Sequence, residues 1–308
     1  MRVAVVGAAG VIGMSVLPTL VEAGHEVVGL ARTPEKARRL RSAGALPWAT
    51  SLLDHDGLAA MFDGADAVCN FTTQVPAGRS AVRPAVRPHA WRTNDRLRTD
   101  GVRRVVRAAR EAGVRRVVQE SVSTLYADQG DGWVTEASPL AITRATEPAS
   151  VGELHVQDYA CGSRVGVVLR LATILGDDPL TRAKVRSARH GHAIGLGDPD
   201  GWAHVVHTDD VGPAVLAALG VPSGIYNVGA EPVRRADLVA GFAVAAGRER
   251  LDFIGPVLRR VGGVRLEPLT RSLRVSSEHF GTVGGWSPTR PRFDASWLGR
   301  PLQSEALR

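Results

Sequence analysis

The chain has no long apolar run and only two cysteines. Its 308 residues contain no stretch of about 18 apolar residues, so the sequence predicts no membrane-spanning helix. Residues 1–6 run into a glycine turn too early for a secretory signal. Cys69 and Cys161 are too far apart in sequence for a zinc site or a disulfide framework. We therefore expect no metal, a cytoplasmic location and two buried thiols.

Lysine is nearly absent, although the formal net charge is +7. Lys36 and Lys184 are the two lysines, and the arginines are spread along the whole chain. Their densest stretch, residues 79–116, contains one aromatic residue, Trp91, and no motif typical of nucleic-acid recognition. We interpret the charge as a preference for arginine in a solvated surface and expect no nucleic-acid or membrane partner.

Apolar runs that predict strands alternate with helical patterns over the first half of the chain. The runs cover residues 3–6, 26–30, 66–70, 116–119 and 165–169. Between them, apolar residues recur at helical spacing, as in Val102, Val105, Val106 and Ala109. This alternation predicts an α/β fold with right-handed crossovers and a parallel, doubly wound sheet of Rossmann type.

A glycine-rich turn joins the first predicted strand to the first predicted helix. In the sequence Gly7-Ala8-Ala9-Gly10-Val11-Ile12-Gly13, the first glycine allows a tight turn and the second lets backbone approach a pyrophosphate. The third lets the helix pack closely on the sheet. The backbone N–H groups of the helix start, which include those of Val11 and Ile12, face the phosphates. The turn predicts a dinucleotide-binding site.

The residues after the second predicted strand bear on the choice of cofactor. An acidic side chain at this point would bind the ribose hydroxyls of NAD. The chain instead has Ala31-Arg32-Thr33-Pro34, and Arg32 can form a fork of hydrogen bonds to the 2′-phosphate of NADP. We therefore predict NADP as the cofactor in preference to NAD, with an ordinary surface arginine as the alternative.

The alternation of predicted strands and helices becomes irregular after about residue 175. We predict a cofactor-binding domain over residues 1–175 and a mainly substrate-binding region over residues 176–308. Residues 203–228 are expected to return to the first domain, because strand and helix patterns reappear there. The expected lining of the substrate site is Trp202, Trp286, Arg271 and the loop around Gly195-Leu196-Gly197, with a place in the core as the alternative for either tryptophan.

These motifs resemble the extended short-chain dehydrogenase/reductases, the group that includes sugar-nucleotide epimerases and dehydratases. The spacing Gly7-x-x-Gly10-x-x-Gly13 is the variant found in that family, and Val206-His207-Thr208-Asp209-Asp210-Val211 and Tyr226-Asn227-Val228-Gly229 resemble two later family motifs. The resemblance runs almost end to end and implies an enzyme that binds NAD(P) and a small-molecule substrate. It also implies cofactor contacts from the turns after later strands, for which we expect Ser51, Leu52, Thr72 and Thr73. Members of the family often pair through two helices resembling residues 95–112 and 150–160, which leaves a homodimer open.

The catalytic residues of that family are not present. The family uses a Tyr-x-x-x-Lys pair on a helix and a serine or threonine on the preceding strand, where the lowered pKa of the tyrosine lets it relay a proton. Alignment on Tyr126 places Val122 at the hydroxyl position, and counting back from the strand at Val165 places Val151 and His155 at the tyrosine and lysine positions. The chain contains no other Tyr-x-x-x-Lys sequence.

Four residues are candidates to replace the missing relay. Tyr126 follows the catalytic strand, where the resemblance also implies a packing and substrate-contact role. His155 has a side chain suited to proton transfer near neutral pH, with a supporting or helix-surface role as its alternative. Ser121 and Ser123 flank Val122 and face away from its side in a regular strand, so a one-residue bulge would be needed to bring one of them to the site. Glu153 is expected to be solvated.

Three functions fit these observations. The first is an NADP(H)-dependent oxidoreductase that acts on a small organic substrate, such as a secondary metabolite, with a non-standard proton relay, since the cofactor itself carries the hydride chemistry. The second is a redox-neutral isomerase, dehydratase or cyclase in the same pocket. The third is a non-catalytic protein that senses NADP or binds a partner, because fold does not dictate function.

Overall fold

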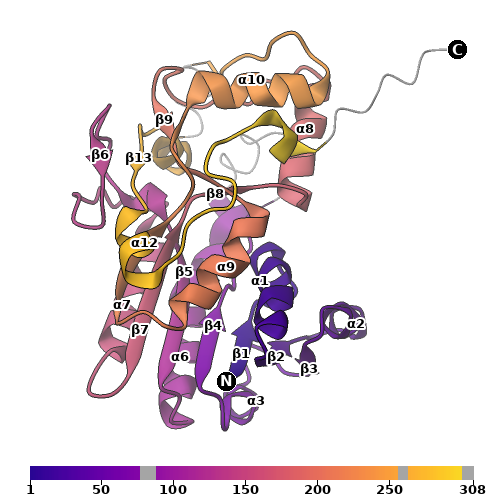
Figure 1. Ribbon diagram of the computed structural model, residues 1–308, viewed down its shortest axis with the longest axis vertical. Coiled ribbons are helices and arrows are strands. Elements are labelled where there is room, and N and C mark those ends of the chain that lie inside the picture. Colours follow the sequence, from indigo (N-terminus) through magenta and orange to yellow (C-terminus); the bar gives the residue numbers. More distant parts are fainter. Residues whose placement is uncertain (77–87, 256–262, 300–308) are drawn as a thin grey trace, which may run out of the picture.

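A parallel sheet forms the centre of the molecule. The structure is a computed structural model that describes residues 1–76, 88–255 and 263–299 (Figure 1). Its seven-stranded sheet has the order β11-β7-β5-β4-β1-β2-β3, and every neighbouring pair is parallel. The strands are β1 (Arg2–Val6), β2 (Glu26–Leu30), β3 (Leu46–Trp48), β4 (Ala67–Asn70), β5 (Arg116–Val122), β7 (Val165–Leu171) and β11 (Gly224–Val228). The predicted doubly wound α/β fold is confirmed.

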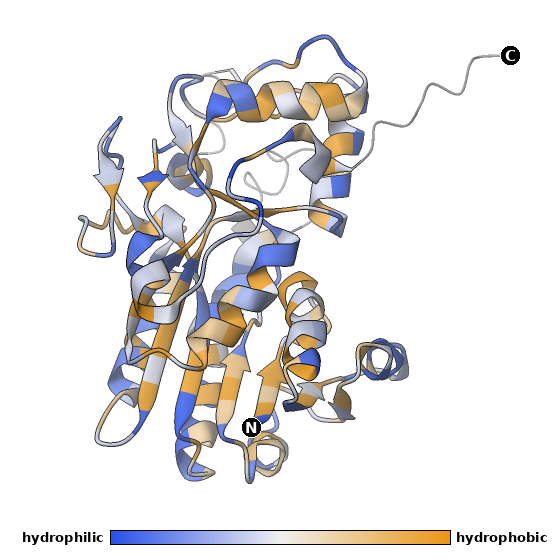
Figure 2. Cartoon of the chain, viewed as in Figure 1, coloured by the Kyte–Doolittle hydropathy of each residue, from blue (hydrophilic) through white to orange (hydrophobic). Residues whose placement is uncertain are grey.

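Helices cover both faces of this sheet. The sheet strands are apolar along most of their length, as a sheet buried on both sides requires (Figure 2). One face packs against α1 (Val11–Glu22), α2 (Pro34–Ser42) and α9 (Thr208–Ala218). The other packs against α3 (His55–Phe62), α6 (Val102–Glu111) and α7 (Glu147–Tyr159). Two apolar layers therefore hold the carboxyl ends of the strands in fixed positions.

Short elements connect the strands at the carboxyl edge of the sheet. Before α6 the chain forms η1 (Pro88–Trp91), α5 (Arg92–Arg96) and the π-helical turn η2 (Leu97–Gly101). After β5 it forms the 3-10 turn η3 (Ser123–Leu125) and the short strand β6 (Trp133–Val134).

A smaller layer lies beyond this edge and is drawn above the sheet in Figure 1. Its helices α8 (Pro179–Arg189) and α10 (Arg235–Ala246) and the turn η5 (Ala295–Leu298) share an apolar cluster that includes Val185, Phe242 and Trp297. Its paired short strands are β8 (Thr173–Leu175) with β10 (Val205–His207) and β9 (Trp202–Ala203) with β12 (Val233–Arg234). The strand β13 (Arg274–Val275) pairs with β6. The turn η4 (Glu267–Leu269) and the helix α12 (Glu278–Gly284) complete the described elements.

One expectation about side chains was wrong. Cys69 is buried in β4, where burial raises the pKa of its thiol to about 12, but Cys161 is exposed after α7. Trp286, for which the sequence left a substrate lining and the core open, is 5% exposed and packs in the main core beside Phe280.

Candidate active site

The strand order reverses between β1 and β4, and the glycine turn lies at that reversal. In a doubly wound sheet, ligands bind in the crevice outside the carboxyl ends of the strands at this point. Gly7 has a positive φ of 81°, and a Cβ there would lie 2.6 Å from the backbone carbon of Phe71. A Cβ on Gly13 would lie 2.3 Å from the Ala8 carbonyl oxygen. Both positions therefore require glycine so that the turn, the helix and β4 can approach.

Gly10 is different, because a Cβ there would meet only the Gly7 carbonyl oxygen, at 3.2 Å. Gly10 is the N-cap of α1, and no side chain caps the helix. The first N–H groups of α1, on Val11, Ile12 and Gly13, therefore open toward the crevice, as anion binding at a helix start requires. The close approach of backbone to backbone at Gly7 and the exposed helix start at Gly10 fit the pyrophosphate of a nicotinamide dinucleotide.

The turn after β4 is held beside this crevice by buried amides. The Asn70 side chain accepts hydrogen bonds from the backbone N–H and hydroxyl of Thr72 and donates to Gln119 on β5, at 2.8 Å. Asn94 on α5 accepts from the backbone N–H of Gln74. These bonds fix the loop that carries Thr72 and Thr73, so both expected cofactor contacts lie at the carboxyl end of β4.

The other expected cofactor residues follow β2 and β3. Arg32 is exposed two residues after β2, and no acidic side chain stands beside it at the end of the strand. Ser51 and Leu52 are half-buried after β3, where the Ser51 hydroxyl accepts from the backbone N–H of Leu53. All of the expected cofactor residues thus lie along the carboxyl edge of one half of the sheet, while their individual roles remain predictions.

The second half of the crevice contains a buried ion pair between α7 and β7. Glu153 receives two hydrogen bonds from the Arg170 guanidinium, at 2.9 and 2.7 Å, and a third from the Ser121 hydroxyl at 2.5 Å. Burial alone would lower the pKa of Arg170, but the hydrogen bonds and charge of Glu153 raise it. The expectation that Glu153 is solvated was wrong, because its carboxylate is needed to neutralise an arginine inside the sheet.

A second buried ion pair lies next to the first. Arg98 on η2 donates to Glu120 Oε1 on β5 at 2.8 Å, and both side chains are at most about one-tenth exposed. The other carboxylate oxygen, Glu120 Oε2, is buried and has no hydrogen-bond partner among the described residues. Burial raises the pKa of Glu120, the charge and hydrogen bond of Arg98 lower it, and the charge of Glu153 raises it again, so that the net shift is upward. Glu120 is therefore a buried carboxylate with one unpaired oxygen near the carboxyl end of a central strand.

Helix α7 presents no proton relay to the sheet. Its buried residues are Pro148, Ala149, Gly152, Glu153, Val156 and Tyr159. Val151 and His155, the positions aligned with the family tyrosine and lysine, lie beside this face and are half-buried. One turn before Glu153 on the buried face stands Ala149, which cannot ionise. The two aligned positions hold neither a tyrosine nor a lysine. The tyrosine of this helix, Tyr159, is buried at its end and donates to the Val114 carbonyl oxygen, and both lysines of the chain lie elsewhere, on α2 and α8.

The serine and tyrosine candidates are engaged in the protein interior. The pairing of β5 with β7 runs from Arg116 to Val122 without a bulge, so neither serine is brought to the position of Val122. Ser121 bonds to Glu153, and Ser123 is buried at the start of η3. Tyr126 has no exposed surface, and its hydroxyl donates to Asn227 at 2.8 Å. Burial raises the pKa of the Tyr126 phenol, which favours a structural role for it over proton transfer.

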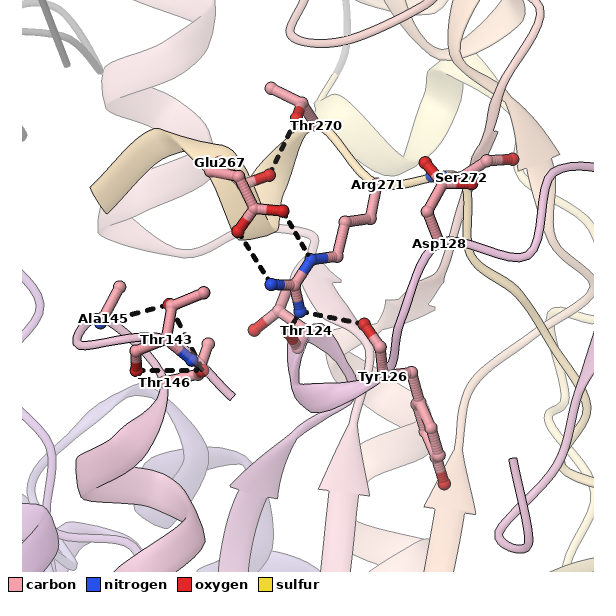
Figure 3. A network of polar contacts seen from close by, with 10 residues as sticks. All are labelled: Thr124, Tyr126, Asp128, Thr143, Ala145, Thr146, Glu267, Thr270, Arg271 and Ser272. Carbon is pink, nitrogen blue, oxygen red and sulfur yellow. Dashed lines mark hydrogen bonds and ion pairs between the residues drawn. The ribbon is translucent and has the colours of Figure 1, made fainter. Parts of the chain in front are cut away.

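Arg271 ties the smaller layer to the end of β5. Its guanidinium donates to the backbone carbonyls of Thr124 and Tyr126, each at 2.9 Å, and pairs with Glu267 (Figure 3). The side chain is only 3% exposed. It therefore fixes η3 rather than lining an open substrate surface as expected.

The sequence contained a signal for the two ion pairs that motif reading did not use. Gln119, Glu120 and Ser121 follow the apolar start of the strand 117–122, and Arg170 interrupts the apolar strand 165–171. A charge inside a buried strand requires a partner, so Glu120 and Arg170 each predict an opposite charge from another element. The identity of those partners, Arg98 and Glu153, depends on helix packing across tens of residues and is not contained in local spacing.

Neither a membrane-spanning helix nor a metal-binding cluster is present among the described residues. No described helix is both long and apolar enough to cross a membrane. Within residues 1–76, 88–255 and 263–299, no group of three or more His, Cys, Asp or Glu side chains could hold a metal ion.

Comparison with known proteins gives a consistent result. A family model described as NAD(P)H-binding matches residues 7–150. The chain is 31% identical to a 3-diazoavenalumate denitrifying reductase of a Streptomyces species, over 97% of this chain and 100% of that protein. It is 32% identical to a UDP-glucose 4-epimerase of Streptomyces lividans over 51% of this chain and 46% of that protein.

Solved structures share the whole fold. MoeE5 in complex with UDP-glucose and NAD superimposes with a TM-score of 0.77 at 22% identity, covering 98% of this chain and 97% of MoeE5. A UDP-glucose 4-epimerase of Thermotoga maritima with UDP-glucose has a TM-score of 0.77 at 20% identity, covering 97% and 96% of the two chains. At this level of identity the likeness concerns the fold.

Proposed function

The chain belongs to the extended short-chain dehydrogenase/reductase family of enzymes, and from this premise we propose that it is an NADPH-dependent reductase of an electron-poor aromatic diazo compound. The predicted nicotinamide cofactor is confirmed at the level of NAD(P). The finer assignments, to NADPH and to a diazo substrate, form the proposal.

One observation carries it: the glycine turn is intact, whereas Val151 and His155 of α7 stand at the positions aligned with the family tyrosine and lysine. Epimerases and dehydratases of this fold must move a proton as well as a hydride, and the proton needs a relay. A reaction that retains only the hydride step matches a site that keeps cofactor binding and has lost the relay. The relative that aligns end to end is named as a reductase that acts on a diazo compound.

Reduction of an arenediazonium ion is a reaction of this kind. The bound nicotinamide supplies a hydride, which corresponds to two electrons and one proton. A carbon–hydrogen bond forms, the carbon–nitrogen bond breaks, and dinitrogen leaves with the bonding electrons. The positive charge passes from the substrate to the oxidised cofactor, so atoms and charge balance and no proton is taken from the protein.

The residues of this chain would bind and orient the reactants. The N–H groups at the start of α1 would hold the pyrophosphate, and Arg32 would bind the 2′-phosphate. The loop fixed by Asn70 and Asn94 would present Thr72 and Thr73 to the cofactor. The buried pairs of Glu153 with Arg170 and Glu120 with Arg98 keep the carboxyl end of β5 rigid and exclude water from it.

Two measurements test the proposal. The first is a fluorescence titration with NADPH and NADH, in which NADPH should bind more tightly. The second follows NADPH absorbance and dinitrogen release with 4-hydroxybenzenediazonium as substrate, and should give one NADPH consumed for each dinitrogen. Conversion of a substrate without consumption of NADPH would instead identify a redox-neutral enzyme, and the absence of binding by either cofactor would contradict both enzymatic functions.

A further inference from the structure

A cavity lies beyond the carboxyl end of the edge strand β11, away from the cofactor crevice. Its volume is about 630 Å³, within the range of about 300–1,000 Å³ that is typical of small-molecule sites. Its walls come from β6, β13, α12 and the loops at residues 229–232 and 285–291. Four steps of the sheet order separate β11 from β1, and neighbouring strands lie about 4.8 Å apart, so the two strands are about 19 Å from each other (Figure 1).

Glycine and proline residues keep this space open. Gly285 follows α12 with a positive φ of 64°, and a Cβ there would have no atom within 4 Å. A Cβ on Gly229 would overlap the ring of His204, so the loop after β11 has to pass this point without a side chain. Pro232 and Pro291 add rigid apolar wall. The hollow is therefore built into the backbone.

An ordered indole stands in the wall of this cavity. Trp133 lines the cavity with 55% of its surface exposed. The guanidinium of Arg274 lies 4.2 Å from the centre of the Trp133 ring and 4.8 Å from that of Trp202, which fixes the exposed indole in a stack. The lining includes Trp133 but not Arg274, so the part of the ring that faces the cavity is open. An indole surface of this kind attracts a cation.

The charge of the cavity lining is opposite to that of the chain. The formal net charge of the protein is +7, yet none of the described residues that line the cavity is a lysine, an arginine or a histidine. Two exposed carboxylates, Glu231 and Glu278, belong to the lining. Glu231 pairs with Arg292 at 2.9 Å, whereas the Glu278 carboxylate has no ion-pair partner among the described residues. This charge favours a positively charged ligand and disfavours a nucleotide.

We propose that this cavity is a second ligand site, which binds a small organic cation, a quaternary or protonated amine with an apolar body. The ammonium group contacts the indole of Trp133 and the carboxylate of Glu278, and the apolar body packs against Val275 and the proline walls. This site goes beyond the proposed function, because its ligand binds away from the cofactor and need not react. It also differs in chemistry from the crevice, where backbone N–H groups bind phosphate.

The experiment compares choline with its uncharged isostere dimethylbutanol, in which a carbon atom replaces the nitrogen. Both are titrated into the wild-type protein with and without NADPH, and the indole N–H signals of the tryptophans are followed by NMR. Choline should bind about tenfold more tightly than the alcohol and should shift the Trp133 signal. Its affinity should be the same with and without NADPH. Equal binding of the two compounds, or displacement of choline by NADPH, would overturn the proposal.

Three variants place the site, with thermal unfolding as a check of folding. E278Q should lower the ratio of choline to alcohol affinity about threefold, because it removes an exposed charge that no described residue neutralises. W133L should lower the same ratio about fivefold through loss of the cation–π contact. E249Q is the matched control, since Glu249 is an exposed glutamate outside the lining, and it should leave the ratio unchanged. An unchanged ratio in folded E278Q, or an equal decrease in E249Q, would contradict the assignment.

Discussion

The two halves of the crevice are built from different parts of the chain. At β1 and α1 the site consists of peptide groups brought together by Gly7, Gly10 and Gly13, which lie within seven residues of one another. At β5 and α7 it consists of charged side chains from η2, β5, α7 and β7. The first half needs the absence of side chains, whereas the second depends on which side chains are present. Cofactor binding and reaction chemistry can therefore change independently.

The largest expected effect tests the backbone half. In Gly13→Ala the new Cβ would lie 2.3 Å from the Ala8 carbonyl oxygen, so α1 must move from the sheet. We expect a loss of stability of about 3 kcal/mol and loss of NADPH binding, measured by thermal unfolding and fluorescence titration. Gly10→Ala is the matched control, because its Cβ has only the 3.2 Å contact to Gly7. It should fold normally and bind NADPH more weakly, and equal effects of the two variants would contradict the distinction.

The next effect tests the side-chain half. Glu153→Gln removes the charge that neutralises Arg170, and a buried charge without its partner costs about 3–5 kcal/mol in unfolding free energy. Urea unfolding should show this loss, and the double variant E153Q/R170M should recover much of it. If the single variant is as stable as the wild type, the pair does not hold the end of β5.

The pH dependence of stability should sharpen the same contrast. The net upward shift of the Glu120 pKa means that the folded protein favours the protonated carboxyl, with Arg98 opposing and Glu153 adding to the shift. Its contribution to stability is therefore greatest below the ordinary pKa of 4.5 and is lost as the pH rises through the raised value. Urea unfolding of wild type and E120Q at several pH values above 4.5 should show this loss in the wild type alone. Parallel pH profiles would contradict it.

A smaller effect concerns the choice between cofactors. Arg32→Ala should weaken NADPH binding about tenfold and leave NADH binding unchanged, because the lost contact is a charge-assisted bond to the 2′-phosphate. Arg38, an exposed arginine on α2, provides the control, since Arg38→Ala changes the net charge equally. Equal effects of the two variants would reduce the role of Arg32 to general surface charge.

The smallest effect concerns Tyr126. Tyr126→Phe removes the hydrogen bond to Asn227 and should cost about 1 kcal/mol in unfolding free energy. Because the hydroxyl is fully buried in the protein, the rate of NADPH oxidation should not change. A large loss of rate in a folded variant would restore Tyr126 as the proton donor.

The difference between local motifs and long-range contacts explains which features of the fold and site could be predicted from the sequence. The glycine turn and the strand pattern are local, so residues 7–13 predicted both the cofactor class and the fold. Glu153 was expected to be solvated, and only the packing of α7 against Arg170 shows why the carboxylate is buried. The regular pairing of β5 with β7 likewise decides the orientation of Ser121, which spacing alone left open. What the sequence could not supply are contacts between side chains more than about fifteen residues apart.

The open helix start at Gly10 has a consequence for how such enzymes diversify. The anion-binding site at the start of α1 consists of backbone N–H groups, which every backbone of this conformation provides. A substitution therefore weakens the site only where a new side chain has no room. Cofactor binding at this turn does not depend on a particular side chain, so it can persist while the residues at the neighbouring strand ends change. Replacements on β5 and α7 can therefore alter the reaction site while the peptide groups that bind the cofactor stay in place.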